Sequence, residues 1–354
     1  MASHAESLKS QYPWTSKPFI VSAPLRAIAG PALATSVSRA SGLGFLGAGT
    51  DLSNFEQMFS ECINILQKSP IPNSLPGIVP IGVGFICWGA SLPVALSVIT
   101  KANLKPAAAW LFAPKEAKDL MEWAQGIRKA SNGKTRIWVQ VGTVAMAIEI
   151  VRSCEPDVLV IQGSDAGGHG LAKSSSIISL LPECADALQR EGFGHIPLVA
   201  AGGVMDGRGV VAAIALGATG ICMGTRFLST PEAVVSKGYQ YAVIRAKDGG
   251  VSTARTRLYD SLRGTPGWPE DYNGRGVLNH SFWDHEKGMG EKENTRLYEK
   301  AVETGDAGWG DQGRMTTYAG TGVGLIHKVQ PAAEIVAEVL REAKKYLTGA
   351  QSRL

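Results

Sequence analysis

Short apolar runs and helix-length amphipathic segments alternate along the first two thirds of this sequence. The predicted strands are Phe19–Leu25, Gly44–Gly49, Val79–Phe85, Ala107–Phe112, Arg136–Gly142, Asp157–Gly163, Pro197–Gly203 and Gly220–Phe227. The predicted helices between them include Asn54–Lys68, Lys115–Ala130, Val144–Ser153, Ile177–Arg190 and Gly207–Leu216. This alternation indicates parallel strands joined by helical crossovers. We predict an α/β fold in which the strand–helix units close into a (β/α)8 TIM barrel, with a doubly wound open sheet as the alternative.

Residues Gly249–Ala319 break this alternation. Glycine, proline, tryptophan and charged residues mix there without a sustained period, so we expect an irregular insertion or lid after strand eight, with one short helix near Glu293–Thr304. Such a long segment is expected to cover the barrel mouth or to form a small subdomain. An amphipathic helix is expected from Pro331 to about Tyr346. The expected units are a barrel at 1–248, an insertion or lid subdomain at 249–319, and a C-terminal segment and helix at 320–354 that returns to the barrel.

Two groups of residues in the insertion are candidates for a function. Trp268, Trp283 and Trp309 could shape substrate choice beneath a lid or could pack a small satellite core, and both interpretations stay open. His280 and His285 lie near acidic residues, but no other cluster of metal ligands supports a site there. We interpret the two histidines as solvated loop residues and predict no metal site.

Charge and cysteine usage argue against several classes of function. The formal net charge is +4 and is spread along the chain, without the basic run that would follow a nucleic-acid backbone. No stretch approaches the roughly 18 apolar residues of a membrane span, and the N-terminus lacks the apolar core of a secretion signal. The cysteines form no CxxC pair, so we expect buried free thiols. We predict a soluble cytoplasmic protein without nucleic-acid or membrane partners, and leave open whether it is a homo-oligomer.

A buried strand followed by a glycine-rich turn carries the candidate catalytic residue. Residues 157–170 read DVLVIQGSDAGGHG, in which the apolar part is typical of a strand covered on both faces. The glycines that follow let the backbone approach a ligand. His169 is expected to project from this turn at the carboxyl end of a parallel strand, where barrels place their active sites. Its pKa near neutrality suits proton transfer, so we predict a catalytic base rather than a turn cap.

The next two predicted strands also end in glycine turns, which contain Gly202, Gly203 and Gly224. In barrels the loops after strands seven and eight commonly hold a phosphate through backbone N–H groups. Thr225 would add one hydroxyl group to this cradle. Arg226 is either a phosphate partner or a residue that pairs with an acid behind the sheet, because successive strand residues point to opposite sides.

Several of these segments resemble the signature segments of the nitronate monooxygenases, formerly called 2-nitropropane dioxygenases. They are QGSDAGGHG, AAGGVMDGRGVVAAIALGA, CMGTRF and, at the C-terminal end, YAGTGVGLIHKVQPAAEIV. The sequence Ala23-Pro24-Leu25 is similar to the family's Ala-Pro-Met on the first strand, so the resemblance spans the whole chain. It implies an FMN-containing barrel that oxidises alkyl nitronates and nitroalkanes with O2 to a carbonyl compound and nitrite.

The resemblance also assigns the site residue by residue. It implies that His169 is the catalytic base. Together with the glycine turns it implies that FMN is bound by Pro24, Leu25, Gly84, Gln162, Gly167, Gly168, Gly202, Gly203, Cys222, Met223, Gly224 and Thr225. Two departures leave the substrate open. Gly84 stands where the family commonly has an asparagine, so it offers only backbone contact, and Asp165 replaces a longer glutamate.

Two other functions compete with this interpretation. An FMN-dependent enoyl-thioester reductase that uses NAD(P)H would share the Gly-Gly-His and Met-Gly-Thr-Arg-Phe segments, and a related flavoenzyme could act on a biosynthetic substrate. The long insertion and the C-terminal Gly-Val-Gly favour the nitronate enzymes. A barrel that has lost catalysis and only binds a phosphate ligand is the other alternative, and the presence of His169 argues against it.

Overall fold

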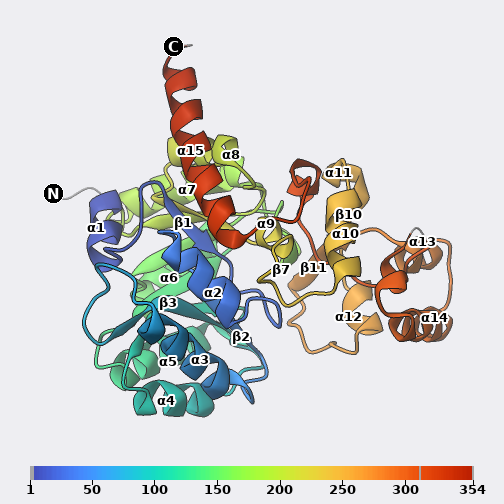
Figure 1. Cartoon of the computed structure of the whole chain (residues 1–354), viewed down its shortest axis with the longest axis horizontal. Helices are drawn as coiled ribbons and strands as arrows, with labels where there is room; N and C mark the ends of the chain where they lie inside the picture. Colours follow the sequence, from blue (N-terminus) through green and yellow to red (C-terminus); the bar gives the residue numbers. More distant parts are fainter. Residues whose placement is uncertain (1–3, 311, 353–354) are drawn as a thin grey trace.

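The computed structural model describes residues 4–310 and 312–352 of the 354-residue chain. Eight parallel strands form one sheet in the order β1-β9-β8-β6-β5-β4-β3-β2. An isolated parallel bridge from Val21 in β1 to Leu43, just before β2, brings the two outer strands together. The sheet is therefore a nearly closed barrel, which confirms the TIM barrel and excludes the open sheet (Figure 1). The barrel strands are β1 (Phe19–Ser22), β2 (Phe45–Gly49), β3 (Ile78–Ile86), β4 (Lys105–Phe112), β5 (Arg136–Val141), β6 (Val158–Gln162), β8 (Leu198–Ala201) and β9 (Gly220–Met223).

Helices cover the outside of the barrel because each of them buries one apolar face. In α5, for example, Leu120, Trp123 and Ile127 are buried at helical spacing, while the opposite face is charged. The covering helices are α2 (Pro31–Arg39), α3 (Phe55–Lys68), α4 (Leu92–Lys101), α5 (Ala117–Ala130), α6 (Val144–Cys154), α7 (Ile177–Arg190), α8 (Gly207–Ala215) and α15 (Ala332–Gln351). Helix α15 begins directly after Pro331, as predicted, and returns to pack on α8.

Aromatic side chains fill the barrel interior near the amino ends of several strands. Phe45 of β2 and Trp138 of β5 lie with their ring centroids 5.3 Å apart. Tyr12, which follows α1 (His4–Gln11), packs against Trp138 and accepts a hydrogen bond of 2.8 Å from its Nε1 atom. Both residues are fully buried. The interior at this end is therefore a packed core, and space for a ligand exists only toward the carboxyl ends.

Two predicted strands end earlier than expected. Phe19–Leu25 was too long, because β1 stops at Ser22 and Pro24, which has no N–H group, bends away from the ladder. Gly220–Phe227 was also too long, because β9 stops at Met223 and the short helix α9 (Thr225–Leu228) follows Gly224. In both cases the apolar run continues into a turn, and hydrophobicity alone does not mark the change.

The segment after the barrel is more regular than the irregular insertion that we predicted. A second, three-stranded sheet in the order β10-β11-β7 contains β10 (Thr253–Thr256) and β11 (Tyr272–Val277). Its third strand, β7 (Gly168–Leu171), comes from the loop after β6. These strands are short and rich in glycine and arginine, so they lack the apolar alternation that identifies a strand in a sequence. Antiparallel pairing with a distant segment forms them.

Helices complete a second unit, which consists of the elements from α10 to η2 together with β7. This unit lies to one side of the barrel (Figure 1). Its helices are α10 (Lys237–Arg245), α11 (Gly249–Ser252), α12 (Leu258–Leu262), α13 (His280–Glu286), α14 (Glu291–Glu303), η1 (Gly305–Trp309) and η2 (Thr321–Leu325). The helix predicted near Glu293–Thr304 corresponds to α14, and the others were missed. Leu258, Tyr259 and Tyr298 form part of a small separate core.

The cysteines and the two histidines of the insertion have defined places in the structure. All five cysteines are free and buried, as predicted. His280 and His285 lie on α13 rather than on a loop, and no group of metal-binding side chains occurs among the residues that the structure describes. Within the same residues, no helix is long and apolar enough to cross a membrane.

The hydrogen bond between Trp138 and Tyr12 is expected to stabilise the folded protein. Tyr12→Phe leaves the buried Nε1 donor of Trp138 without its acceptor, which costs about 1–3 kcal/mol. We expect a lower urea midpoint of unfolding than in the unmodified protein. Tyr241→Phe, at an exposed tyrosine, is the matched control and should leave the midpoint in place. Equal midpoints for all three proteins would show that this hydrogen bond does not stabilise the barrel.

Candidate active site

A cavity of about 900 Å³ lies at the carboxyl ends of the strands, between the barrel and the second unit. Its walls include residues from the β1 loop, β3, β6, β7, β8, α9, α12, α14 and the segment before η2. The predicted site residues that line it are Pro24, Leu25, Gly84, Gln162, Gly167, Gly168, His169, Gly202, Gly203, Cys222, Gly224 and Thr225. Met223 does not line the cavity, since it is the last residue of β9 and its side chain is buried in the main core. The structure therefore brings together all but one of the predicted site residues.

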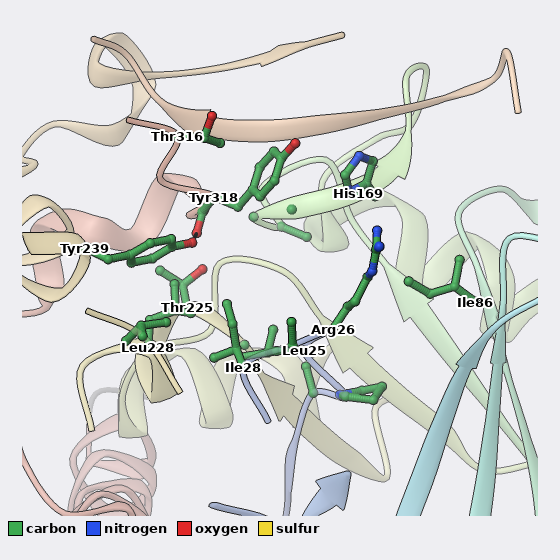
Figure 2. Close-up of a pocket in the computed structure, with 18 of the residues that line it drawn as sticks. Leu25, Arg26, Ile28, Ile86, His169, Thr225, Leu228, Tyr239, Thr316 and Tyr318 are labelled. Carbon is green, nitrogen blue, oxygen red and sulfur yellow. Dashed lines mark hydrogen bonds between the residues drawn. The ribbon is translucent and has the colours of Figure 1, made fainter. Parts of the chain in front are cut away.

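His169 lies on strand β7 and not on a glycine turn as expected. In β7 it is paired with Gly274 of β11. A Cβ atom on Gly274 would lie 2.6 Å from the Tyr318 ring, so glycine is needed there to let this ring approach. The strand fixes the direction of the imidazole, which points into the cavity beside Tyr318 (Figure 2).

A carboxylate from the second unit holds the His169 ring. Nε2 of His169 lies 2.9 Å from Oδ1 and 3.0 Å from Oδ2 of Asp260, which is on α12. A carboxylate only accepts hydrogen bonds, so Nε2 carries the proton in this pair and Nδ1 keeps its lone pair. Tyr318 donates from its hydroxyl to Asp260 Oδ1 at 2.7 Å. Burial and the Asp260 charge both raise the pKa of Tyr318, so this donor stays protonated.

The protonation state of His169 is set by burial acting against Asp260. Burial lowers the pKa of His169 below its usual value of 6.5, and the hydrogen bond and charge of Asp260 offset part of this effect. The indole of Trp268 stacks on the imidazole, with ring centroids 3.7 Å apart and an angle of 5° between the planes. This stacking contributes to the exclusion of water that lowers the pKa. His169 is thus a neutral base at pH 7, with its orientation fixed on two sides.

Two half-buried arginines hold the loop that leads to His169. Arg255 donates to the carbonyl oxygens of Ala166 and Asn273, both at 3.1 Å. Arg275 donates from Nε to the carbonyl oxygen of Ser164 at 3.2 Å. Burial and the charge of Arg275 lower the pKa of Arg255 to about 10. The second sheet therefore positions the loop through side chains as well as through backbone pairing.

The glycine turns after β8 and β9 form the polar end of the cavity. Gly202 and Gly203 have φ values of +107° and +78°, in the region that favours glycine. Gly224 precedes α9, and the Thr225 hydroxyl oxygen accepts a hydrogen bond of 2.9 Å from the Gly320 N–H. The O–H of Thr225 is therefore free to donate toward the cavity that it lines. Backbone N–H groups and one hydroxyl at a turn are a typical phosphate cradle.

Arg226 belongs to the other side of the barrel wall. It is buried, donates to Gln330 Oε1 at 3.1 Å, and lies 3.8 Å from Glu338 of α15. It does not line the cavity. Of the two alternatives for this residue, pairing with an acid behind the sheet is correct.

The two departures from the family pattern have local explanations. A Cβ atom on Gly84 would lie 2.2 Å from the Pro24 ring, so glycine at this position lets the β1 loop cross β3. Asp165 accepts a hydrogen bond of 3.1 Å from the Thr321 hydroxyl, which ties the loop after β6 to η2. The shorter acid therefore still anchors the turn.

Sequence reasoning missed three residues that complete the site. Asp260 and Tyr318 lie 91 and 149 positions after His169, and no local spacing connects them. Arg26 follows the Ala-Pro-Leu segment directly and lines the cavity, but a single arginine beside a strand carries no signal. Trp268 was considered for a lid or a satellite core, and it belongs to the site. Trp309 lines the cavity as well, whereas Trp283 is exposed on α13.

Comparison with known proteins places the chain in a family. A profile described as nitronate monooxygenase matches residues 120–342. Nitronate monooxygenase npaC of Metarhizium robertsii is 46% identical over 99% of this chain and 97% of its own length. FabK from Thermotoga maritima has a TM-score of 0.74 at 22% identity and covers 98% of this chain and 99% of its own. A nitroalkane oxidase from Streptomyces ansochromogenes has a TM-score of 0.71 at 22% identity, with 97% and 99% covered. At this identity the two structures share the barrel fold, and the sequence relationships show that the chain belongs to the nitronate monooxygenase family of oxidoreductases.

Proposed function

We propose that this protein oxidises alkyl nitronates and nitroalkanes with O2 to a carbonyl compound and nitrite, with FMN as its cofactor. The observation that carries this proposal is His169, which Asp260 orients in a cavity whose wall also contains glycine turns suited to binding a phosphate. Family membership supports the reaction class. The small-molecule partners are then the nitro compound and O2.

The cavity fits FMN on three grounds. Its size of about 900 Å³ falls within the range of cofactor sites. Gly202, Gly203, Gly224 and Thr225 supply donors for one phosphate, and Pro24 and Leu25 offer an apolar wall. Gln162, Cys222 and the backbone of Gly84, Gly167 and Gly168 would contact the ring system. When bound, FMN supplies the redox chemistry.

His169 supplies the proton transfer. A neutral nitroalkane carries an acidic C–H bond beside the nitro group, and Nδ1 of His169 accepts this proton. The electron pair of the broken bond moves onto the nitro oxygens, which gives the nitronate anion. Asp260, through Nε2, stabilises the imidazolium that forms. A substrate that arrives as a nitronate does not need this step.

The second unit has more than one role in this proposal. It supplies Asp260, Trp268 and Tyr318 to the site, and we infer that its residues 249–319 also act as the lid of the cavity. The free buried cysteines support a reducing compartment, which we take to be the cytoplasm. Assembly into a homo-oligomer stays a prediction.

The cofactor proposal is tested by Gly224→Val. A Cβ atom on Gly224 would lie 3.5 Å from Ala23 and Leu25, an ordinary contact, so the chain should fold. The valine methyl groups would occupy the phosphate cradle. We expect the purified protein to be yellow with stoichiometric FMN, and the variant to be colourless after desalting. Gly349→Val, on open surface of α15, should retain the flavin. Stoichiometric FAD, or full FMN retention by Gly224→Val, would contradict this site.

The base is tested with a nitroalkane and its own preformed nitronate. His169→Ala should lower turnover of the neutral nitroalkane by about 10²- to 10⁴-fold, the usual contribution of a positioned base. Turnover of the nitronate should fall much less, and FMN content should not change. Equal losses on both substrates would show that His169 braces the site. Oxidation of NADPH with an enoyl thioester, in the absence of nitronate turnover, would assign the reductase activity instead.

The role of Asp260 is tested by the pH dependence of nitroalkane turnover. Activity should fall on the acid side as His169 becomes protonated, with an apparent pKa below 6.5. Asp260→Asn removes the charge that raises this pKa, so the acid limb should move to lower pH. The plateau should also fall, by up to about tenfold for each pKa unit that the base loses. Tyr318→Phe keeps the carboxylate and should not move the limb to lower pH. If the acid limb of the pH profile is unchanged in Asp260→Asn, Asp260 does not control the pKa of His169.

A further inference from the structure

Arg26 brings a positive charge into the active-site cavity. It lies in the loop after β1 and lines the same cavity as His169. Figure 2 shows its side chain extending from the β1 loop with the guanidinium toward His169. Among the described residues, no hydrogen bond or ion pair joins Arg26 to a protein partner within bonding distance. The Asp51 carboxylate feels the charge of Arg26 without forming a hydrogen bond or ion pair with it, so the guanidinium donors are available for a ligand.

The backbone around Arg26 makes room for this orientation. A Cβ atom on Gly47 would lie 2.3 Å from the carbonyl oxygen of Leu25, so this glycine lets the β1 loop lie directly on β2. A Cβ atom on Gly49 would lie 2.7 Å from Cγ of Arg26. The alkyl stem of Arg26 therefore lies against Gly49, where any larger residue would collide with it. The position of Arg26 in the cavity follows from this packing, even though the residue as a whole is exposed.

The other charged side chains in the cavity either contact protein groups or carry a negative charge that would repel an anion. Arg263 lies over the Tyr318 ring, 5.5 Å from its centroid. Asp260 is occupied by His169 and Tyr318. Glu299 and Glu303 of α14 also line the cavity and would repel an anion. Arg26 is thus the lining group with the charge and the freedom to bind a negatively charged substrate.

We propose that Arg26 binds the nitronate group of the substrate and selects the anion over the neutral nitro compound. This inference rests on the proposed function. A nitronate is planar and shares its charge between two oxygens, a shape that matches the two parallel N–H donors of a guanidinium. Arg26 stabilises the same anion when His169 produces it in the site by removing a proton from a nitroalkane. Arg26 thereby acts in substrate binding for one form and in proton removal for the other.

Steady-state kinetics on one carbon skeleton in both forms separates these effects. With the holoenzyme of Arg26→Gln, KM for ethyl nitronate should rise about tenfold, the loss expected for a charge-assisted pair that is partly exposed to water. KM for neutral nitroethane should change little, while its kcat falls because the product anion loses its partner. Arg26→Lys keeps the charge but lacks the two parallel N–H donors of the guanidinium. Its KM for ethyl nitronate should lie between those of the unmodified enzyme and Arg26→Gln. Raised salt should increase KM for the nitronate in the unmodified enzyme and much less in Arg26→Gln.

Two further arginines control for a general change in charge. Arg341→Gln removes an exposed arginine on α15, outside the cavity, and should leave both KM values unchanged. Arg263→Gln removes the other arginine that lines the cavity. Selective loss of nitronate affinity in Arg263→Gln, with none in Arg26→Gln, would overturn the proposal. An equal rise in KM for both substrate forms in Arg26→Gln would overturn it as well.

A binding measurement keeps this test independent of turnover. Propionate is a planar two-oxygen anion of similar length that cannot be oxidised as a nitronate is, and its binding is followed by the change in flavin absorbance. We expect weaker propionate binding by about tenfold in Arg26→Gln. If the enzyme turns over no nitronate but propionate binding still depends on Arg26, the proposed function fails and the anion site stands. If nitronate is turned over and propionate binding does not depend on Arg26, the anion site is wrong and the proposed function stands.

Discussion

Backbone pairing between β7 and β11 holds His169 opposite Gly274 and joins the barrel to the second unit. Without this pairing, the loop after β6 would be a glycine-rich turn with a mobile histidine. With it, the imidazole has a fixed direction. Helix α12 follows β10 of the same sheet and places Asp260 against Nε2. Glycine at position 274 contributes to the same arrangement, because the lack of a Cβ atom lets the Tyr318 ring approach. The second unit therefore contributes side chains to the wall of the cavity.

Burial then determines what this fixed histidine can do. Trp268 stacks on the ring and the surrounding protein removes water, which lowers the pKa of His169 below 6.5. The lowered pKa keeps the ring neutral at pH 7. Asp260 limits the decrease in pKa, so the ring keeps part of its basicity. The same carboxylate is held by the Tyr318 hydroxyl. The chain thus places a neutral base, His169, and a cation, Arg26, on the walls of one cavity, an arrangement suited to forming and binding an anion.

The barrel and most of the cavity could be predicted from the sequence because their signals are local. Buried parallel strands are continuous apolar runs, and the glycine turns that follow them, such as Gly202 and Gly203, stand out at fixed places in the strand–helix alternation. The second sheet could not be predicted, because strands such as TART in β10 have no apolar alternation and form by pairing with distant segments. Asp260 was missed for the same reason, since its role depends on a contact across 91 residues of sequence. Met223 was assigned to the cofactor from the motif alone, and its side chain points into the core.

The protonation state of His169 in the resting enzyme tests this account most directly. Nitrogen-15 NMR of histidine-labelled protein, with the His169 signals assigned by their loss in His169→Gln, reports both the tautomer and the pKa. The account predicts a neutral ring at pH 7 with its proton on Nε2, and a pKa below 6.5. An imidazolium at pH 7, or a neutral ring with its proton on Nδ1, would contradict the claim that Asp260 presents His169 as a base.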